Sequence, residues 1–298
     1  MTTARITVVL ITHERRSEVL HTLDRLAELP ERPPVVVVDN GSADGTAAAV
    51  RIHHPRVRLI RLAANLGAVA RNVAVAGVDT PYVAFCDDDT WWEAGSLALA
   101  ADLLDRHPSV AALTGRILVE PGGREDPITP ELRHSPVPAP PGLPGPALLG
   151  ILAGASVLRV SAFREVGGFS RRLWLGGEEE LLSIDLAARG WWMCWIEDMR
   201  VHHAPSPHRD GRRRRRLGIR NTLWTAWLRR PLGGAARHTA DVLRGAPRDL
   251  VSAAAVAEAA AGLPWVLCER RRIPASVEHG LRLLAEPRRN SAARRYVG

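Results

Sequence analysis

The chain has 298 residues, of which 46% are hydrophobic and 24% charged, as in an ordinary folded globular protein. Its formal net charge is +8, and because it contains no lysine, every fixed side-chain cation is an arginine. The three cysteines include no CxxC pair, which argues against a disulfide framework or a structural zinc site and fits a reducing cytosol. No signal peptide is recognisable, and the most apolar stretch, residues 251–267, is too short and too interrupted to span a membrane. We therefore expect a cytoplasmic protein.

The first ninety residues alternate between strand and helix signals. Short β-branched runs predict buried strands, and apolar residues at helical spacing predict the helices between them. The expected strands are 5–12, 33–42, 57–63 and 82–88, and the expected helices are 16–29, 43–54 and 65–78. This alternation predicts parallel βαβ units, whose ligands bind beyond the carboxyl ends of the strands. The polar sequences THER, DNGS and CDDD all fall at such ends, which predicts one shared ligand site.

The second half of the chain carries weaker signals. A helix over 93–106 and a strand over VAALTGRILVEP precede a proline-rich stretch, residues 126–146, which we expect to lack regular structure because proline has no amide donor. The segment GGEEELLSIDLAARGWWMCWI then predicts a helix leading into a strand. From residue 211 onward, arginine and alanine dominate at helical spacing. We expect one α/β domain over 1–210 and a basic, mainly helical extension over 211–298.

The sequence FCDDDTWW, residues 85–92, concentrates three carboxylates and therefore requires a positive partner. If the strand runs through Phe85 and Cys86, Asp87 and Asp89 project to one side of the strand end and Asp88 points away. Two such carboxylates suit Mg²⁺ or Mn²⁺, with substrate phosphates filling the remaining coordination positions. The alternative is a helix cap, with Asp89 or Thr90 at the start of a helix near Trp91.

A second acid stands at the end of a strand in VVVVDNGSADGT. A turn followed by a helix cap explains Gly41, Asp44 and Gly45 in this segment. It does not explain Asp39, which comes first and can accept a hydrogen bond from a base imide or a ribose hydroxyl. Asp39 is therefore a candidate nucleotide contact.

These segments, with NLGAVARNVAVAG, VGGF, GGEEELLSIDLAARG and VHH, occur in the order and spacing of the family 2 glycosyltransferases. Over roughly residues 5–210 the sequence resembles a nucleotide-sugar transferase of the GT-A fold, an α/β fold with a mixed sheet flanked by helices. The resemblance implies inverting transfer of a sugar from a nucleoside-diphosphate sugar to an acceptor hydroxyl. It also implies Mn²⁺ or Mg²⁺ on the diphosphate and a carboxylate as general base.

The resemblance assigns roles to the matching positions. The implied catalytic base is Glu179, where the family usually has aspartate, with Glu178 beside it. Glu180 adds a third carboxylate, and at least one of the three is expected simply to stabilise the first turn of the following helix. The implied metal ligands are Asp87, Asp89 and His203. The implied nucleotide-binding residues are Thr12, Glu14, Asp39, Asn65, Arg71, Asp87 and Asp88.

Other residues near these motifs are further candidates. Trp92 and Trp174 are expected to stack on the donor sugar or the acceptor. Ser206 or His208 is expected to contact the diphosphate. The cation that neutralises the leaving group remains open among Arg171, Arg172 and Arg209.

The expected partners follow from charge and resemblance. We expect a UDP- or dTDP-sugar as donor, and either a lipid-linked molecule or a small molecule as acceptor. The arginine run at residues 212–216 suits an anionic membrane surface, although it is equally explained as a solvated face. No nucleic-acid-binding motif accompanies the charge, so we expect no nucleic-acid partner.

Two other functions place carboxylates in similar positions. A nucleotidyltransferase also uses Mg²⁺ at strand ends, but it would normally need a glycine-rich loop after the first strand, and THERRSEV contains no glycine. A non-catalytic homologue that binds a nucleotide sugar is the second alternative, and retention of Asp39, Asp89 and the acidic triplet at 178–180 argues against it.

Overall fold

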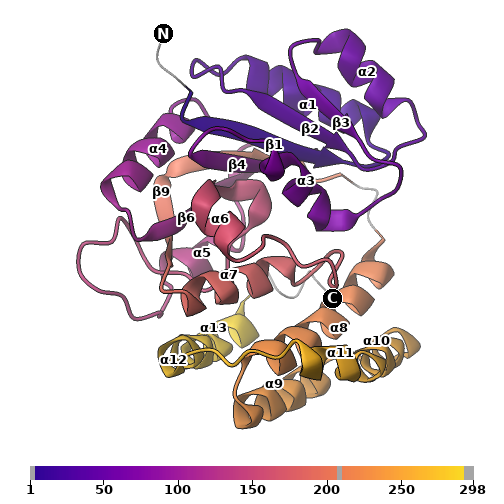
Figure 1. Ribbon diagram of the computed structural model, residues 1–298, viewed down its shortest axis with the longest axis vertical. Helices are drawn as coiled ribbons and strands as arrows, with labels where there is room; N and C mark the ends of the chain where they lie inside the picture. Colours follow the sequence, from indigo (N-terminus) through magenta and orange to yellow (C-terminus); the bar gives the residue numbers. More distant parts are fainter. Residues whose placement is uncertain (1–3, 207–209, 292–298) are drawn as a thin grey trace.

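The computed structural model describes residues 4–206 and 210–291, and its centre is one mixed sheet (Figure 1). Nine strands of the described residues form it in the order β3-β2-β1-β4-β8-β6-β9-β5, with β7 paired to β6. The strands are β1 Ile6–Thr12, β2 Val35–Asp39, β3 Arg58–Arg61, β4 Tyr82–Asp87, β5 Thr90–Trp92, β6 Val110–Val119, β7 Arg124–Glu125, β8 Ser156–Arg159 and β9 Trp192–His203. The four strands from β3 to β4 are parallel, whereas β8 runs antiparallel to both β4 and β6.

Helices cover both faces of the sheet because its strands are apolar on both sides. In β1, Val8 and Leu10 pack on one face and Val9 on the other, as the period of two requires. Helices α1 (Arg16–Ala27), α2 (Thr46–His53) and α4 (Ser96–Arg106) cover the first face. Helices α3 (Ala70–Ala76), α6 (Val160–Glu165) and α7 (Glu178–Ala188) cover the second.

Three local predictions need correction. The helix expected over 65–78 is divided into a 3₁₀ turn, Gly67–Val69, and α3. Helix α4 begins at Ser96, after a glycine in the left-handed conformation, because residues 90–92 form strand β5. The proline-rich stretch contains helix α5 (Thr129–Arg133), in which Pro130 lies in the first turn, where a missing amide donor costs nothing.

The described part of the chain after residue 210 is helical, as predicted. Its helices are α8 Gly211–Arg229, α9 Leu232–Gly245, α10 Leu250–Ala261, α11 Leu263–Cys268, α12 Ala275–Leu283 and α13 Ala285–Asn290. They form a layer beside α7, coloured orange to yellow in Figure 1. Ile273, Val277 and Leu281 belong to the same apolar cluster as the second face of the sheet. The division into domains at residue 210 stays a prediction.

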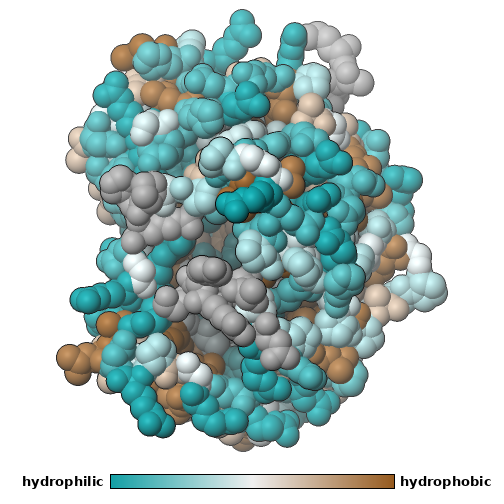
Figure 2. Space-filling view, turned by 180° about the vertical axis from the view of Figure 1, so that it is seen from behind, coloured by the Kyte–Doolittle hydropathy of each residue, from teal (hydrophilic) through white to brown (hydrophobic). Residues whose placement is uncertain are grey.

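The surface opposite the view of Figure 1 is mostly hydrophilic, with scattered apolar side chains (Figure 2). Within the part of the chain that the structure describes, no helix is both long and apolar enough to cross a membrane.

Candidate active site

The register of the parallel strands brings the predicted polar residues to one edge of the sheet. Thr12 at the end of β1 pairs with Asp39 at the end of β2, and Ile11 pairs with Asp87 at the end of β4. The three strand ends therefore open onto the same space, which is where α/β sheets bind ligands.

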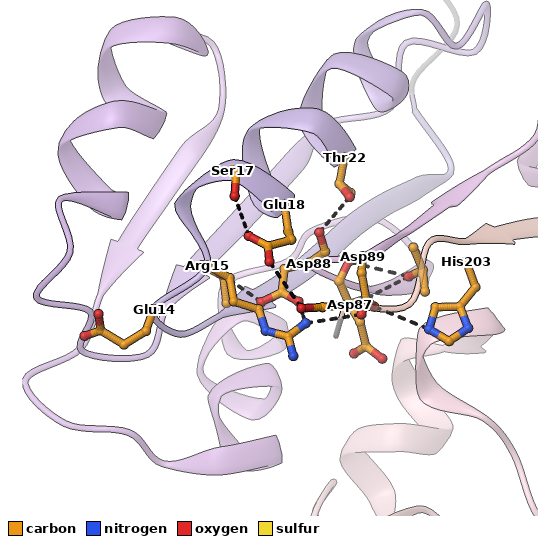
Figure 3. A network of polar contacts seen from close by, with 12 residues as sticks. Glu14, Arg15, Ser17, Glu18, Thr22, Asp87, Asp88, Asp89 and His203 are labelled. Carbon is orange, nitrogen blue, oxygen red and sulfur yellow. Dashed lines mark hydrogen bonds and ion pairs between the residues drawn. The ribbon is translucent and has the colours of Figure 1, made fainter. Parts of the chain in front are cut away.

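Asp88 and Asp89 share one cation, Arg15, in the loop after β1 (Figure 3). The Arg15 Nη1 atom lies 3.0 Å from Asp88 Oδ1 and 3.2 Å from Asp89 Oδ2. The Thr12 hydroxyl donates a 3.0 Å hydrogen bond to Asp88, and the Thr22 hydroxyl donates to the Asp88 carbonyl at 2.8 Å. Burial nonetheless raises the pKa of Asp88 to about 7, and the charges of the other two aspartates add to this effect.

Asp87 has a different partner, the guanidinium of Arg71. The Arg71 side chain is only 4% exposed and lies over the rings of Phe85 and Phe169, 5.7 Å from each ring centre. The prediction that Asp87 and Asp89 project together is therefore wrong. Strand β4 ends at Asp87 and a turn follows, so the alternation of side chains does not continue through the triplet. The alternative of a helix cap is also wrong, because no helix begins at this turn.

Asp89 also faces His203, whose Nε2 atom lies 3.8 Å from Asp89 Oδ1. The antiparallel pairing of β5 with β9 sets Thr90 opposite His203 and so brings the two side chains together. No group of three or more metal-ligating side chains gathers in the described residues, so the predicted trio with Asp87 is not preformed. The two donors that do meet match what Mg²⁺ or Mn²⁺ takes from a protein when phosphates and water complete its shell.

Asp39 is fully buried at the end of β2. Its Oδ1 atom accepts a 3.0 Å hydrogen bond from the Ser42 amide, while Oδ2 has no hydrogen-bond partner among the described residues. The nearest cation, Arg61, has its Nε atom 3.8 Å from Oδ2. A buried acceptor without a donor is costly, so this atom is suited to receive a hydrogen bond from a ligand.

Asn40 is a site residue that the sequence analysis missed. It is buried, and its amide group donates to the Gly67 carbonyl at 3.0 Å and accepts from the Leu66 amide at 2.9 Å. These bonds hold the segment that contains Asn65 against the turn after Asp39. The signal was its position beside Asp39 in the sequence DNGS, which a turn explains equally well.

Glu14 lies apart from the aspartates in Figure 3. Its backbone adopts a positive φ of 53°, and its carboxylate accepts a 2.6 Å hydrogen bond from the Ala43 amide. It thus ties the loop after β1 to the loop after β2. Residues 13–15 of this loop and residues 16–18 at the start of α1 line an open surface hollow together with Asp44.

The acidic triplet forms the first turn of α7, which follows Gly177 in the left-handed conformation. Glu178 is buried, its Oε2 atom has no hydrogen-bond partner within the described residues, and burial raises its pKa. Glu179 accepts a hydrogen bond from the Ala153 amide. Burial, reinforced by the charge of Glu178, raises the pKa of Glu179 to about 8. Glu180 pairs instead with Arg288 of α13 at 2.8 Å.

Both acids of this pair are also influenced by the charges of Asp87 and Arg71. The acidic helix therefore lies beside the strand ends.

Residues 7–167 match the family model described as Glycosyl transferase family 2. The chain belongs to this family.

Curated relatives agree with the family assignment of this glycosyltransferase. An N-acetylglucosaminyl-diphospho-decaprenol L-rhamnosyltransferase of Mycobacterium tuberculosis is 30% identical over 243 residues, covering 68% of this chain and 78% of the relative. A pre-mycofactocin glycosyltransferase of the same species is 32% identical over 161 residues, covering 49% of this chain and 32% of that protein.

Solved structures confirm the predicted GT-A-type fold of the glycosyltransferase. A mannosyltransferase from Pyrobaculum calidifontis, PcManGT, solved with GDP-Man and Mn²⁺, has a TM-score of 0.60 at 21% identity, covering 99% of this chain and 86% of that chain. GalNAc-T7, solved with UDP, GalNAc and Mn²⁺, has a TM-score of 0.59 at 14% identity, covering 76% of this chain and 48% of that chain. At these identities the likeness establishes the fold alone.

The two candidate tryptophans of the glycosyltransferase differ in exposure. Trp92 is 1% exposed and belongs to the apolar cluster on the first face of the sheet, so the prediction that it stacks on a sugar is wrong. Its position in β5 turns it inward. Trp174 is half-buried, its indole donates to the Asn65 carbonyl at 3.1 Å, and Arg213 lies 4.3 Å above its ring. Trp174 thus remains a candidate.

The residues predicted to contact the diphosphate differ in the partners that the structure gives them. The Ser206 hydroxyl donates to Glu18 at 3.3 Å, whereas His208 and Arg209 lie outside the described residues. Arg172 pairs with Glu269 at 2.8 Å on the helical layer.

Proposed function

We propose that this glycosyltransferase inverts configuration as it moves a sugar from a nucleoside-diphosphate sugar to an acceptor hydroxyl. The observation that carries the proposal is that three acidic groups with different surroundings meet at one edge of the sheet. They are Asp39, whose Oδ2 atom accepts no hydrogen bond from the described residues, the pair Asp89 and His203, and the buried pair Glu178 and Glu179. Asp39 can bind the nucleobase, Asp89 and His203 can hold the metal on the diphosphate, and the glutamate pair can take the proton of the acceptor hydroxyl.

The nucleoside is assigned to the ends of β1 and β2. The Oδ2 atom of Asp39, which accepts no hydrogen bond from the described residues, can accept one from the imide of uracil, thymine or guanine, which agrees with the expected UDP- or dTDP-sugar and equally allows GDP. Asn40 and Asn65 shape the adjoining loop. The two structural neighbours named above were solved with GDP-Man and with UDP.

The diphosphate is assigned to the side of Asp89 and His203, which would hold Mn²⁺ or Mg²⁺. A divalent ion there would neutralise charge that develops on the leaving diphosphate. Arg15 already lies against Asp89, so the chain itself places a cation at this position. Both structural neighbours contain Mn²⁺, which supports the assignment.

The acceptor hydroxyl is assigned to the side of α7. A hydroxyl becomes a competent nucleophile only when its proton is removed in the transition state, and a carboxylate with a raised pKa is a suitable base near neutral pH. Glu179 has this property, with Glu178 beside it raising the pKa further. Attack from this side, opposite the leaving diphosphate, inverts the anomeric carbon.

The acceptor is proposed to be lipid-linked, because the rhamnosyltransferase relative acts on a diphospho-decaprenol. Contact with an anionic membrane surface through the arginine run is part of this proposal. Two arginines of the run are already engaged, Arg215 with Asp249 and Arg216 with Glu258. Arg212 and Arg214 are exposed and can reach a surface. Their joint change to glutamine should weaken sedimentation with phosphatidylglycerol vesicles, and unchanged sedimentation would remove membrane contact from the proposal.

Calorimetry tests the donor assignment. UDP-, dTDP- and GDP-sugars are titrated with Mn²⁺, Mg²⁺ or chelator into the wild-type protein, Asp89→Asn and the exposed control Asp198→Asn. We expect metal-dependent binding of one nucleotide, lost in Asp89→Asn and kept in the control. Binding that survives chelation and the Asp89 change would contradict the metal assignment. With the donor known, the anomeric configuration of the product, read by NMR, tests inversion.

A further inference from the structure

The loop that precedes the acidic helix has an unusual backbone. Three of its residues have positive φ angles, Trp174 at 62° and Gly176 and Gly177 at 84° each. Tryptophan rarely adopts this conformation because its Cβ atom crowds the backbone. A loop of this kind keeps its shape only where its surroundings determine it.

Asn221 of helix α8 holds the loop from the side of the C-terminal layer. Its side chain is fully buried, and its amide nitrogen donates to the carbonyls of Leu173 at 2.9 Å, Leu175 at 3.1 Å and Gly176. Its Oδ1 atom accepts a 3.0 Å hydrogen bond from Arg220 Nε. Only the amide nitrogen can face three carbonyl oxygens, so the chemistry of the surroundings fixes the orientation of the group.

The segment that adjoins Asp39 holds the same loop from the other side. The Trp174 carbonyl accepts a 2.8 Å hydrogen bond from the Ala68 amide, and the Trp174 indole donates to Asn65. The approach is so close that a Cβ atom on Gly67 would lie 2.2 Å from the Trp174 carbonyl oxygen. The loop therefore joins the nucleotide side of the site to Glu178 and Glu179.

The C-terminal helices also form ion pairs with α7 itself. Arg229 of α8 pairs with Asp185 at 2.5 Å, and Arg288 of α13 pairs with Glu180 at 2.8 Å. The first ion pair holds the body of the helix and the second holds its first turn, whereas Asn221 holds the loop from which the helix starts. The first turn, which carries the proposed base, is thus located by residues from outside the α/β part of the chain.

We propose that Asn221 is a positioning residue for catalysis, which sets the location of the Glu178 and Glu179 carboxylates relative to the donor. The inference rests on the proposed function, since it takes these carboxylates as the catalytic pair. A displacement of about 1 Å in a catalytic group can reduce turnover about a hundredfold without affecting the binding of a distant ligand. Asn221 is bonded to Leu173, Leu175 and Gly176, whereas the contacts with the nucleotide side are made by Trp174, so we expect Asn221 to act on turnover and not on nucleotide affinity.

The test compares Asn221→Ala and Asn221→Asp with two controls on the same helix. The change to aspartate keeps the shape of the side chain but removes the donor, and it sets a negative charge against the three carbonyls. Thr225→Val is the neutral control, because the Thr225 hydroxyl is buried and has no hydrogen-bond partner in the described residues. Trp224→Phe is the control for lost stability, because it removes the 2.9 Å hydrogen bond from the Trp224 indole to the Ala259 carbonyl.

Three quantities are measured for each variant: Tm, the Kd of UDP, dTDP or GDP with Mn²⁺, and kcat for hydrolysis of the matching sugar donor, in which water replaces the acceptor. We expect kcat to fall at least about tenfold in Asn221→Ala and further in Asn221→Asp, with Kd within about twofold of wild type. Trp224→Phe should have a lower Tm than the wild-type protein and the same kcat. Turnover in the Asn221 variants equal to that of Trp224→Phe would overturn the inference.

Hydrogen exchange gives a second measurement if Asn221→Asp does not fold. Amides 177–181 should exchange at least about tenfold faster in Asn221→Ala than in Trp224→Phe, and equal exchange would overturn the inference. Glu178→Gln and Glu179→Gln separate the two proposals. Loss of kcat in a glutamate variant but not in the Asn221 variants overturns the inference alone. Full turnover in both glutamate variants overturns the proposed base and the inference with it.

Discussion

Two arginines from different elements, a loop and a helix, neutralise the aspartate triplet. Arg15, after β1, contacts Asp88 and Asp89, while Arg71, in α3, contacts Asp87. Adjacent like charges are thus shared between two cations on separate elements. Asp88 also accepts a hydrogen bond from the Thr12 hydroxyl, so the middle carboxylate supports the loop, whereas Asp89 faces His203.

Replacement of Arg15 tests this division of charge. In Arg15→Met, Asp88 and Asp89 lose their shared cation, and the free energy of unfolding without metal should fall by about 2–3 kcal/mol. Mn²⁺ should then raise Tm more than it does in the wild-type protein, because the ion no longer competes with a guanidinium. Thermal melts with Mn²⁺ and with chelator measure both effects, and Arg16→Met, on the exposed neighbour, is the control. An identical Mn²⁺ response in both variants would contradict the assignment of Asp89.

The raised pKa of Glu179 predicts opposite effects of pH on activity and stability. The pKa in the folded protein, about 8, lies above the ordinary value of 4.5, so the stability linked to this group is complete below about pH 4.5 and is lost as pH rises through 8. A base must be ionised, so kcat should rise over the same range. Glu179→Gln should lower kcat by about 10²–10⁴-fold and flatten both profiles, whereas Glu180→Gln should retain the rise of kcat with pH. A pH profile unchanged in Glu179→Gln would exclude this residue as the base.

Several elements are placed by contacts that are distant in sequence. Strand β5 is only three residues long and follows the turn at Asp88 and Asp89, yet it orients Asp89 toward His203 because it pairs with the end of β9. The loop at 173–177 is similarly shaped by α8 on one side and by residues 65–68 on the other. At this scale the site depends on how short segments pack together more than on their own propensities.

The stability cost of a side chain at Gly67 has two sources, the close contact with Trp174 and the positive φ angle, and a comparison with Gly95 separates them. Both Gly67 and Gly95 have positive φ angles, 63° and 86°, but a Cβ atom on Gly95 meets no other atom within 4 Å. Gly95→Ala should cost about 1 kcal/mol of unfolding free energy from backbone strain alone. Gly67→Ala should cost about 2–4 kcal/mol because the Trp174 carbonyl must move, and it should weaken nucleotide binding. Chemical denaturation and calorimetry measure the two effects, and equal costs would mean that the loop moves freely.

The whole molecule is joined by a core that the C-terminal layer shares with the sheet. Ile273 and Val277 lie in the same apolar cluster as residues of β1 and β4. Arg230 at the end of α8 and Glu278 of α12 form a buried ion pair with two hydrogen bonds, at 2.9 and 3.0 Å. This shared packing argues for a chain that unfolds as one unit.

Breaking the buried pair tests this cooperativity. Arg230→Met should lower the free energy of unfolding by about 3–5 kcal/mol, because Glu278 is left buried without its partner. The double variant Arg230→Met with Glu278→Met should recover most of the loss. Circular dichroism and tryptophan fluorescence should report one common transition in each protein. Two separate transitions would instead favour an independent unit over 211–298.

Local sequence patterns predicted the strands that correspond to β1–β4, β6 and β9, the main helices between them and the helical C-terminal region, but not the short strands β5, β7 and β8 or helices α5 and α6. Apolar runs of period two and helical spacing are local properties, and the ends of parallel strands such as those at Thr12, Asp39 and Asp87 must lie at one edge. Long-range packing determined which charges pair, that Trp92 is core, and that Asn221 reaches the loop before Glu178. These are contacts between residues tens to hundreds of positions apart, and no periodicity within a short segment specifies them.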